Sequence, residues 1–518
     1  MIFDKIPIFR RPRNNFDLSH WVKMSFKQAC LIPTTVMDVL PGDKFTISPH
    51  NLLRFAPLAS PVMHEYKVTT DYYFVPNRLL WPNWEDWITG KINTLPPYFQ
   101  NGDEALPKSL ADYLGFPQAG NALAGGLEYS AFPLAAYLLI YDEWYRDQNL
   151  QSEEFIPLVA GAQGETLQDK FYGPPLKRAW NRDYLTSALP FPQSGDAVTL
   201  PLIDGAPVDV TLKTTGTGQP LVKDTTNLTP EGSADLGSDG GGALTNTNTN
   251  NPVVIDPNGS MEVDLNPNAA TINSLRRAFS LQRFLERTAR GGNRYTELIR
   301  SNFGVRPEDS RLQRPELIGR MRQSMTISEV LSTAQTETTG DFTPVGDLKG
   351  HGISAGGGKT FNYFAKEHGW IIGIINVQPE TAYQQALPKK FRRLDRFDYF
   401  WPDLANIGEQ AILNHEVSVH AGDTGTLRGT FAYTPRYSEY RTENNRVAGE
   451  FKTNLNFWHA GRIFNTPGVV PFDSAFIQAD PTRRIFTITD PEVDTIYANI
   501  RVGCRGTRVI PKFGVPKL

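Results

Sequence analysis

The chain has 518 residues, of which 40% are hydrophobic and 11% aromatic, and its formal net charge is −3. This much apolar surface can form a large core, which excludes a chain that is disordered throughout, and two cysteines, Cys30 and Cys504, are too few for a disulfide framework and lack metal-site spacing. The longest strongly apolar run, residues 370–377, cannot span a bilayer, so neither secretion nor membrane insertion is expected. The small number of cysteines fits assembly in a reducing cytoplasm.

Strand and helix patterns begin early in the chain. Apolar residues on both sides of Pro41-Gly42-Asp43 predict a hairpin over residues 34–48. Residues 66–74 alternate at period two, which predicts a half-buried strand. Aromatic and aliphatic side chains recur at helical spacing over residues 137–145, a pattern that more often indicates core packing than a binding site.

Residues 196–270 differ in composition from the rest of the chain. They contain no aromatic residue and are rich in Thr, Asn, Gly and Asp. Ten acidic residues stand against Lys213 and Lys223, which gives this segment a charge of −8. Because so little of it can be buried, it is predicted to be a surface insertion or a disordered loop.

The second half of the chain returns to strand patterns. Before these strands, a stripe of apolar residues over 275–285 predicts another helix, which ends at Gly291-Gly292. With the earlier elements there are at least seven strand candidates separated by long connections, so the sequence predicts an all-β protein with insertions and a few short helices. The further strand candidates are residues 370–377, 416–420, 427–433, 484–489 and 496–502.

Basic charge is concentrated in three places. The first thirty residues hold six basic and two acidic residues, residues 271–325 hold twelve arginines against five acidic residues, and the last eighteen hold five basic residues and no acidic one. A basic arm is suited to bind the phosphate groups of a nucleic acid. Arginine, however, also forms ion pairs at subunit interfaces through its bidentate guanidinium group. For the N-terminal arm both interpretations stay open, whereas a subunit interface is favoured for the arginine-rich stretch.

These charges supply the candidate site residues. The nucleic-acid-facing candidates are Arg10, Arg11, Arg13, Lys23 and Lys27. The subunit-interface candidates are Arg276, Arg277, Arg283, Arg287, Arg290, Arg294 and Arg300.

Motifs for catalysis or metal binding are incomplete. Residues 356–360 (GGGKT) resemble the end of a phosphate-binding loop, but the first glycine of that motif would fall on Ile353, and no apolar strand precedes it. His415 and His420 are five residues apart rather than four, and the strand-forming residues between them would turn them to opposite faces. No His-x-His pair of the kind that cupins use occurs. We expect no enzyme, no metal and no cofactor.

Carboxylate pairs give no support for acid–base chemistry either. Glu85-Asp86 and Asp142-Glu143 lie beside tryptophans in segments that are predicted to be short helices. Such chemistry is unsupported by the sequence rather than excluded by it.

Several longer segments of the sequence resemble those of one protein family. The resemblance runs nearly end to end, and it is to the gokushovirus branch of the microvirus major capsid proteins. The segments that carry it are FDLSH at 16–20, YDEWYRDQNL at 141–150, LPFPQSGDAV at 189–198, ARGGNRYTELIRSNFGV at 289–305, RLQRPE at 311–316, EHGWIIGIINVQPE at 367–380 and FAYTPRYSEYR at 431–441.

This resemblance implies a single eight-stranded viral jelly roll, a β-sandwich with long loop insertions. It also implies that about 60 copies form a T=1 icosahedral shell around circular single-stranded DNA. The implied partners are an internal scaffolding protein, a minor pilot protein, a small basic DNA-binding protein and a host cell-surface receptor. The implied location is the virion.

In the family a variable insertion forms protrusions at the threefold axes, thought to meet the host surface, and residues 196–270 occupy its place. The surface-protrusion candidates are Asp224, Glu231, Asp235, Asp239, Asn246 and Asn248. The predicted parts are a basic arm (1–33), a first core part with helical insertions (34–195), the acidic insertion (196–270) and a second core part with the C-terminal tail (271–518).

One alternative function remains open from the sequence. A carbohydrate-binding, lectin-like jelly roll would have the same strands, and the aromatic stretches at residues 81–87 and 137–145 would suit sugar binding. Saturable glycan binding by a monomer that forms no shells would favour that alternative.

Overall fold

The computed structural model describes most of the chain outside residues 194–271. The described residues are 13–100, 107–117, 128–193, 210–212, 222–224, 236–238, 244–246, 253–255, 261–263, 272–291, 313–333, 336–338, 341–343, 346–419, 424–464, 469–488 and 490–513. The chain divides into two units, residues 1–192 with 288–518, and residues 193–287.

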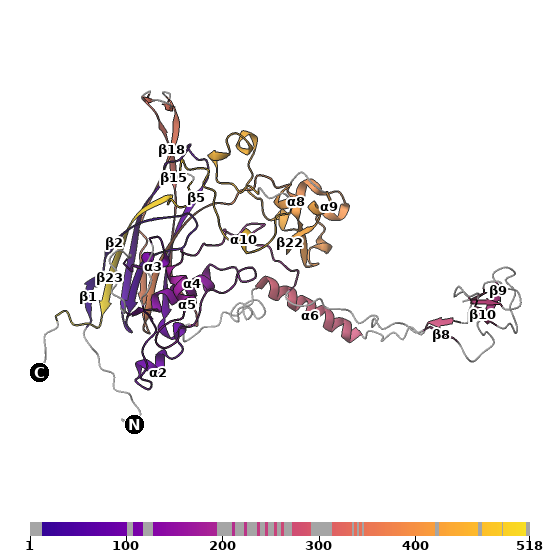
Figure 1. The fold of residues 1–518 in the computed structure, drawn as a ribbon, viewed down its shortest axis with the longest axis horizontal. Coiled ribbons are helices and arrows are strands. Elements are labelled where there is room, and N and C mark those ends of the chain that lie inside the picture. The colour runs from indigo at the N-terminus through magenta and orange to yellow at the C-terminus, as the bar shows by residue number, and fades with distance from the viewer. Residues whose placement is uncertain are drawn as a thin grey trace. The chain divides into compact units, whose positions relative to one another are not determined.

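Two antiparallel sheets form the centre of the first unit (Figure 1). The larger sheet has seven strands: β1 (Asn14–Asp17), β2 (His20–Phe26), β4 (Lys44–Phe55), β15 (Thr326–Leu331), β18 (Leu348–Gly356), β19 (Phe361–Phe364) and β23 (Ile496–Arg508). The smaller sheet has the order β14 (Glu316–Ser324), β5 (Tyr66–Pro76), β20 (Gly369–Pro379) and β3 (Ile32–Val39).

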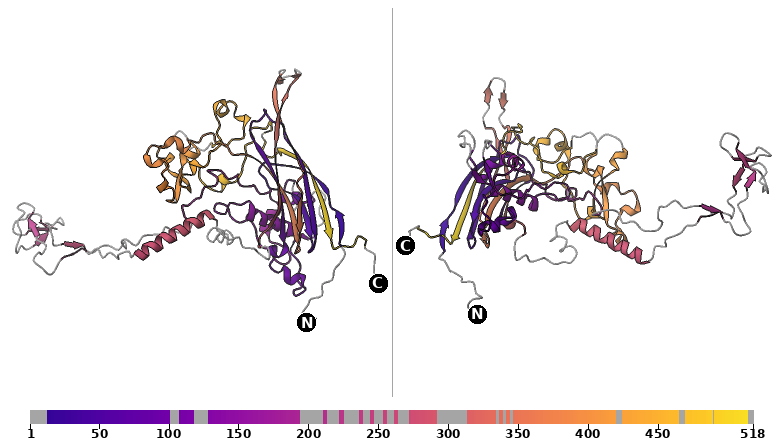
Figure 2. Two further views of the ribbon diagram at one scale, coloured as in Figure 1. Left: turned by 180° about the vertical axis from the view of Figure 1, so that it is seen from behind. Right: turned by 60° about the horizontal axis from the view of Figure 1, so that its bottom comes forward.

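The two sheets pack face to face around one apolar core. In β4 and β23 every second side chain is buried, and these residues meet buried side chains of β5 and β20 from the opposite sheet. Consecutive strands change sheets, as from β3 to β4 to β5. The C-terminal strand β23 lies between β2 and β4, which come from the N-terminal part of the sequence (Figure 2). The fold is therefore an all-β sandwich of the jelly-roll type, as predicted.

Helices cover the outer face of the smaller sheet. They are α1 (Asn77–Leu80), α2 (Trp84–Ile88), α3 (Leu110–Leu114), α4 (Phe132–Trp144) and α5 (Glu165–Tyr172), and a short pair of strands, β6 (Tyr98–Gln100) and β7 (Glu128–Ser130), lies among them. Helix α4 is buried on nearly all sides and packs on Tyr73, Val75 and Ile372. Strand β5 is thus buried on both faces, and the prediction of a half-buried strand was wrong because the sequence did not reveal this second layer.

A third cluster of buried residues forms around a small strand pair. Strands β21 (Glu409–Leu413) and β22 (Thr430–Pro435) pair with each other, and α8 (Asn414–Val417), α9 (Thr424–Leu427) and α10 (Ser474–Ile477) lie in the same part of the chain. The connections contain 3-10 turns: η2 (Lys389–Arg392), η3 (Arg396–Asp398), η4 (Pro402–Leu404), η5 (Ser438–Tyr440), η6 (Gly449–Lys452) and η7 (Asn456–Trp458).

Short strand pairs and one long helix make up the remaining elements. The pairs are β8 (Val210–Leu212) with β13 (Met261–Val263), β9 (Val222–Asp224) with β12 (Val253–Ile255), β10 (Leu236–Ser238) with β11 (Leu244–Asn246), and β16 (Thr336–Thr338) with β17 (Asp341–Thr343). Helix α6 (Ile272–Gly291) includes the predicted stripe at 275–285 and ends at the predicted glycine.

Four strand predictions need correction. The strand expected at 427–433 begins only at Thr430, because residues 424–427 form α9. The strands on either side of Pro41-Gly42-Asp43 exist, but β3 and β4 belong to different sheets, so residues 34–48 form a corner rather than a hairpin. Residues 416–420 were predicted as a strand, yet the described part of this segment begins in helix α8. Within 484–488 the backbone forms only an isolated bridge, from Phe486 to Leu58. The strands at 370–377 and 496–502 and the helix at 137–145 are confirmed.

Candidate nucleic-acid interface

The outer face of the larger sheet carries side chains from three neighbouring strands. Strands β4 and β23 alternate between buried and accessible positions, and β2 alternates between half-buried and exposed positions over most of its length. Because directly opposite residues of antiparallel strands share a face, the pairing register brings the accessible side chains together in rows.

The first row joins Trp21, Arg501 and His50. Arg501 of β23 lies directly opposite His50 of β4 on one side and Trp21 of β2 on the other. The Arg501 guanidinium carbon lies 5.8 Å from the centroid of the Trp21 ring, a cation–π distance. The next two rows are Lys23 with Asn499 and Leu52, and Ser25 with Tyr497 and Arg54. We call these three rows the Trp21 face.

Large aromatic surface is exposed on the Trp21 face. Trp21 is 63% exposed and Tyr497 43% exposed. Beside them a shallow depression of about 600 Å³ is lined by residues that include Trp21, His50, Leu52 and Asn499. The exposed Trp21 ring offers a flat apolar surface with the Arg501 cation next to it.

The glycines of the GGGKT segment border the same depression. Residues 357–360 connect β18 to β19 and do not lead into a helix, so they form no phosphate-binding P-loop. A Cβ atom on Gly357 would lie 2.3 Å from Nδ1 of His50, so a larger residue there would have to displace the exposed His50 ring. These glycines allow the connection to pass close to His50.

Positive charge on this sheet face is largely unpaired. Lys23, Arg54, Arg501 and Arg505 form no ion pair with any carboxylate in the described ranges. Asp17 of β1 lies opposite Arg505, further along β23. Its pKa is lowered mainly by hydrogen bonds from Ser19, with a smaller contribution from Arg505 and Arg501. The face therefore combines aromatic rings with cations that are free to meet an anion.

The predicted arm residues lie in different surroundings. Arg10 and Arg11 fall outside the described residues. Arg13 is exposed, with its guanidinium carbon 5.6 Å from the Phe364 ring centroid. Lys23 is on the Trp21 face, whereas Lys27 forms a surface ion pair of 3.6 Å with Glu492. Of the described candidates, Lys23 alone joins the Trp21 face.

Most of the Trp21 face was not among the predicted site residues. Trp21, His50, Arg54, Tyr497 and Arg501 were not singled out. A signal for Arg501 was present, because alternation over residues 496–502 and the excess of basic residues at the C-terminus together place it on a polar sheet face. The sequence held no signal that β2, β4 and β23 are neighbours.

The arginine-rich stretch falls only partly within the described residues. Arg276, Arg277, Arg283 and Arg287 are exposed on α6, whereas Arg294 and Arg300 lie outside the described ranges. The Arg290 guanidinium already binds within the chain: Nε lies 3.2 Å from Oε1 of Glu409, and Nη1 lies 3.3 Å from the carbonyl of Ser187. The role of this stretch in subunit contacts stays a prediction.

The surface-protrusion candidates are mostly outside the described residues. Asp224 ends β9 and Asn246 ends β11. Glu231, Asp235, Asp239 and Asn248 fall in undescribed segments of the insertion. Their contact with a host surface stays a prediction.

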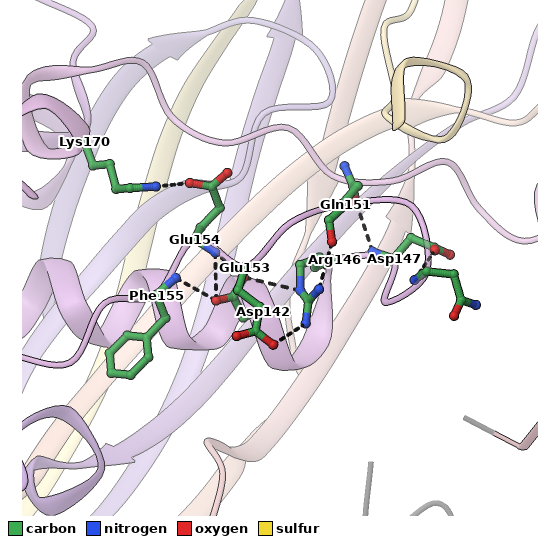
Figure 3. Close-up of polar contacts among 9 residues, drawn as sticks. Asp142, Arg146, Asp147, Gln151, Glu153, Glu154, Phe155 and Lys170 are labelled. Atoms are coloured by element: carbon green, nitrogen blue, oxygen red, sulfur yellow. Dashed lines mark hydrogen bonds and ion pairs between the residues drawn. The ribbon is translucent and has the colours of Figure 1, made fainter. Parts of the chain in front are cut away.

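The carboxylates of the YDEWYRDQNL segment have a structural role (Figure 3). Asp142 is buried and accepts hydrogen bonds from the backbone N–H groups of Glu154, at 3.0 Å, and Phe155, at 2.6 Å. Arg146 lies 3.5 Å from the same carboxylate and donates to the carbonyl of Gln151 at 2.8 Å. These bonds fasten the loop after α4 and leave the carboxylate no free position for catalysis.

Other residues that could carry chemistry are also buried within the fold. His415 is buried in α8 with Nδ1 3.2 Å from the carbonyl of Leu427, and His420 lies outside the described residues. Cys30 and Cys504 are buried free thiols, and burial raises the pKa of each to about 11. In the described part of the chain no three His, Cys, Asp or Glu residues gather as a metal site would need.

The aromatic stretches that suggested sugar binding are largely packed inside. Trp81, Tyr137, Tyr141 and Tyr145 are buried in the core under the helices. Buried rings cannot stack on a sugar, so these stretches do not support the carbohydrate-binding alternative. None of the helices in the described ranges has the length and apolarity of a membrane span.

Comparisons with known proteins agree along the whole chain. Residues 5–518 match the model of the family described as capsid protein (F protein). The capsid protein VP1 of Bdellovibrio phage phiMH2K is 32% identical, covering 99% of this chain and 97% of that protein. VP1 of Chlamydia phage 1 is 30% identical over 100% and 97% of the two chains, and VP1 of Spiroplasma virus 4 is 29% identical over 86% and 84%.

Proposed function

Since the chain belongs to the phage capsid protein (F protein) family, and is therefore a structural protein of the virion that assembles with its own copies, we propose that it encloses circular single-stranded DNA against the Trp21 face. About 60 copies would form the T=1 shell. The single observation that carries the proposal is the meeting of an exposed tryptophan with unpaired cations on one sheet face.

Single-stranded DNA fits the chemistry of this face better than duplex DNA does. Unpaired bases can stack on exposed aromatic rings, and each such contact contributes about 1–3 kcal/mol without selecting a sequence. Arg501, Arg54 and Lys23 surround the rings at the positions where a backbone phosphate would be neutralised. A duplex hides its base faces, so Trp21 would have no partner there.

The finer partners follow the same proposal. A scaffolding protein would guide shell closure, and a pilot protein and a small basic protein would accompany the DNA. The acidic insertion at 196–270 would meet the host surface, because a segment with charge −8 and no aromatic residue suits neither the core nor a DNA-lined lumen.

Binding of a fluorescent oligothymidine to unassembled subunits tests the DNA site. Trp21→Ala should weaken binding about tenfold, as the loss of one stacked base predicts, and Trp21→Phe should keep most of the affinity. Arg501→Ala should weaken binding and reduce its dependence on salt. Unchanged affinity in both alanine variants would overturn the assignment of this face.

A further inference from the structure

A second exposed aromatic surface is formed by the connection between β20 and β21 together with the turn after β22. It consists of five rings, Phe397, Tyr399, Phe400, Trp401 and Tyr440, with three arginines around them, Arg393, Arg396 and Arg436. Each of the five rings is between 47% and 52% exposed. We call these eight residues the aromatic–arginine patch.

Hydrogen bonds hold the patch in one arrangement. The Trp401 indole donates to the carbonyl of Arg396 at 2.8 Å, and the Tyr437 hydroxyl donates to the carbonyl of Tyr399 at 3.2 Å. Asp398 caps the turn by accepting from the backbone N–H groups of Leu394 and Asp395, both at 3.0 Å. These hydrogen bonds therefore hold the rings in exposed positions before a partner binds. Binding would then cost little conformational entropy.

The arginines lie against the rings instead of pairing with carboxylates. The guanidinium carbon of Arg393 is 4.0 Å from the ring centroid of Tyr440, and that of Arg396 is 4.5 Å from the ring centroid of Phe397. Neither these two nor Arg436 forms an ion pair with a carboxylate among the described residues. Their remaining N–H groups can bind acceptors on a partner.

The size of the exposed surface matches a stable protein contact. Phe391, Leu394 and Ile407 of the same connection are 62%, 82% and 61% exposed, which makes eight large apolar side chains with the five rings. At roughly 100 Å² of exposed surface each, they offer on the order of 800 Å², about what each partner buries in an interface of standard size. Exposed apolar surface of this extent indicates a binding partner.

We propose that the aromatic–arginine patch is a contact between neighbouring copies of this chain in the shell. This inference rests on the proposed function only in requiring that shells form. Aromatic rings and arginine are the residues enriched in interface cores. Residues 389–403 hold five basic residues and three aspartates, Asp395, Asp398 and Asp403, so their net positive charge is small, and the large exposed apolar surface favours a protein over DNA.

Two alanine variants of the full chain test this role. Trp401→Ala should reduce the yield of shells, counted by electron microscopy after sedimentation, at least tenfold, while the melting temperature of the free subunit stays near that of wild type because the ring is half exposed. Leu95→Ala is the control: Leu95 is 59% exposed and lies outside both the Trp21 face and the aromatic–arginine patch, so its removal should leave shell yield unchanged. Wild-type shell yield in Trp401→Ala would overturn the inference.

A measurement on the wild-type chain covers the case in which the variant misfolds. Hydroxyl-radical labelling should modify Trp401 and Tyr399 in unassembled subunits at least five times faster than in intact shells. Equal labelling in the two states would overturn the contact. If the wild-type chain and its partners form no shells at all, the proposed function fails; if shells form with Trp401 still reactive, only this inference fails.

Discussion

His459 is a residue whose hydrogen bonds require a neutral ring. Its Nε2 donates to the carbonyl of Phe451 at 2.8 Å, and its Nδ1 accepts from the backbone N–H of Gly461 at 3.0 Å. Arg484 also approaches Nδ1, at 3.3 Å. A second proton on the ring would have to displace the Gly461 donor and would face a guanidinium.

Acidification should therefore destabilise the fold through His459. Burial, with a smaller effect of Arg484, lowers its pKa below the ordinary 6.5. Below about pH 6.5 the unfolded chain then binds a proton that the folded chain does not, so stability falls as pH falls. We expect a lower melting temperature at pH 5.5 than at pH 7.5, and a smaller difference in His459→Gln. The exposed control His50→Gln should keep the wild-type difference; an identical pH response in all three would contradict this account.

Basic side chains show how far residue roles could be predicted. Arg484 is used inside the fold, where it donates to the carbonyls of Asn456 and Gly461, both at 2.7 Å. Arg501 is exposed beside Trp21. The local sequence shows that both residues are charged. Whether an arginine is used inside the fold or is exposed on a sheet face depends on strand neighbours that are hundreds of residues away in the sequence. Regional charge was therefore predictable, and individual roles were not.

Helix α4 is the element that links the smaller sheet to the loop after it. Its buried face packs on β5 and β20, and its C-terminal Asp142 holds the backbone of Glu154 and Phe155. Glu154 in turn forms an ion pair with Lys170 of α5 (Figure 3). One carboxylate thus connects the end of one helix to the segment that leads into the next.

Removal of Asp142 should loosen this connection. Asp142→Ala leaves two backbone donors without their acceptor and removes one of the partners of the half-buried Arg146, which should cost about 3 kcal/mol and lower the urea midpoint of unfolding. Glu153→Ala is the control in the same network, because Glu153 is 76% exposed and should cost less than about 1 kcal/mol. Equal midpoints for the two variants would contradict the role of Asp142.

At the level of elements, local patterns predicted strands better than their pairing. The glycine turn at Gly42 has a φ of +90°, as its sequence suggested, yet the strands around it enter different sheets because each finds a longer partner elsewhere. The failure at 416–420 has another cause. β-Branched residues suggested a strand there, but the Glu416 carboxylate accepts from the backbone N–H of Leu413 at 3.0 Å and closes a helical turn.

At the scale of the whole molecule, the acidic insertion should be separable from the shell-forming part. Residues 204–258 contain no aromatic residue to anchor a core, and they fall in the smaller of the two units. Replacing them by a short Gly-Ser linker should leave shell yield near that of wild type by electron microscopy and reduce attachment to host cells. Loss of shells with a folded subunit would instead place the segment in a subunit contact.

Electron cryomicroscopy of DNA-containing particles tests the central claim most directly, because it shows stoichiometry and orientation at once. The account predicts a closed shell of about 60 copies in which the Trp21 face lines the lumen, with nucleotide density stacked on Trp21 beside Arg501. A shell in which the Trp21 face points to the outer solvent, or in which it is covered by a neighbouring subunit, would contradict it.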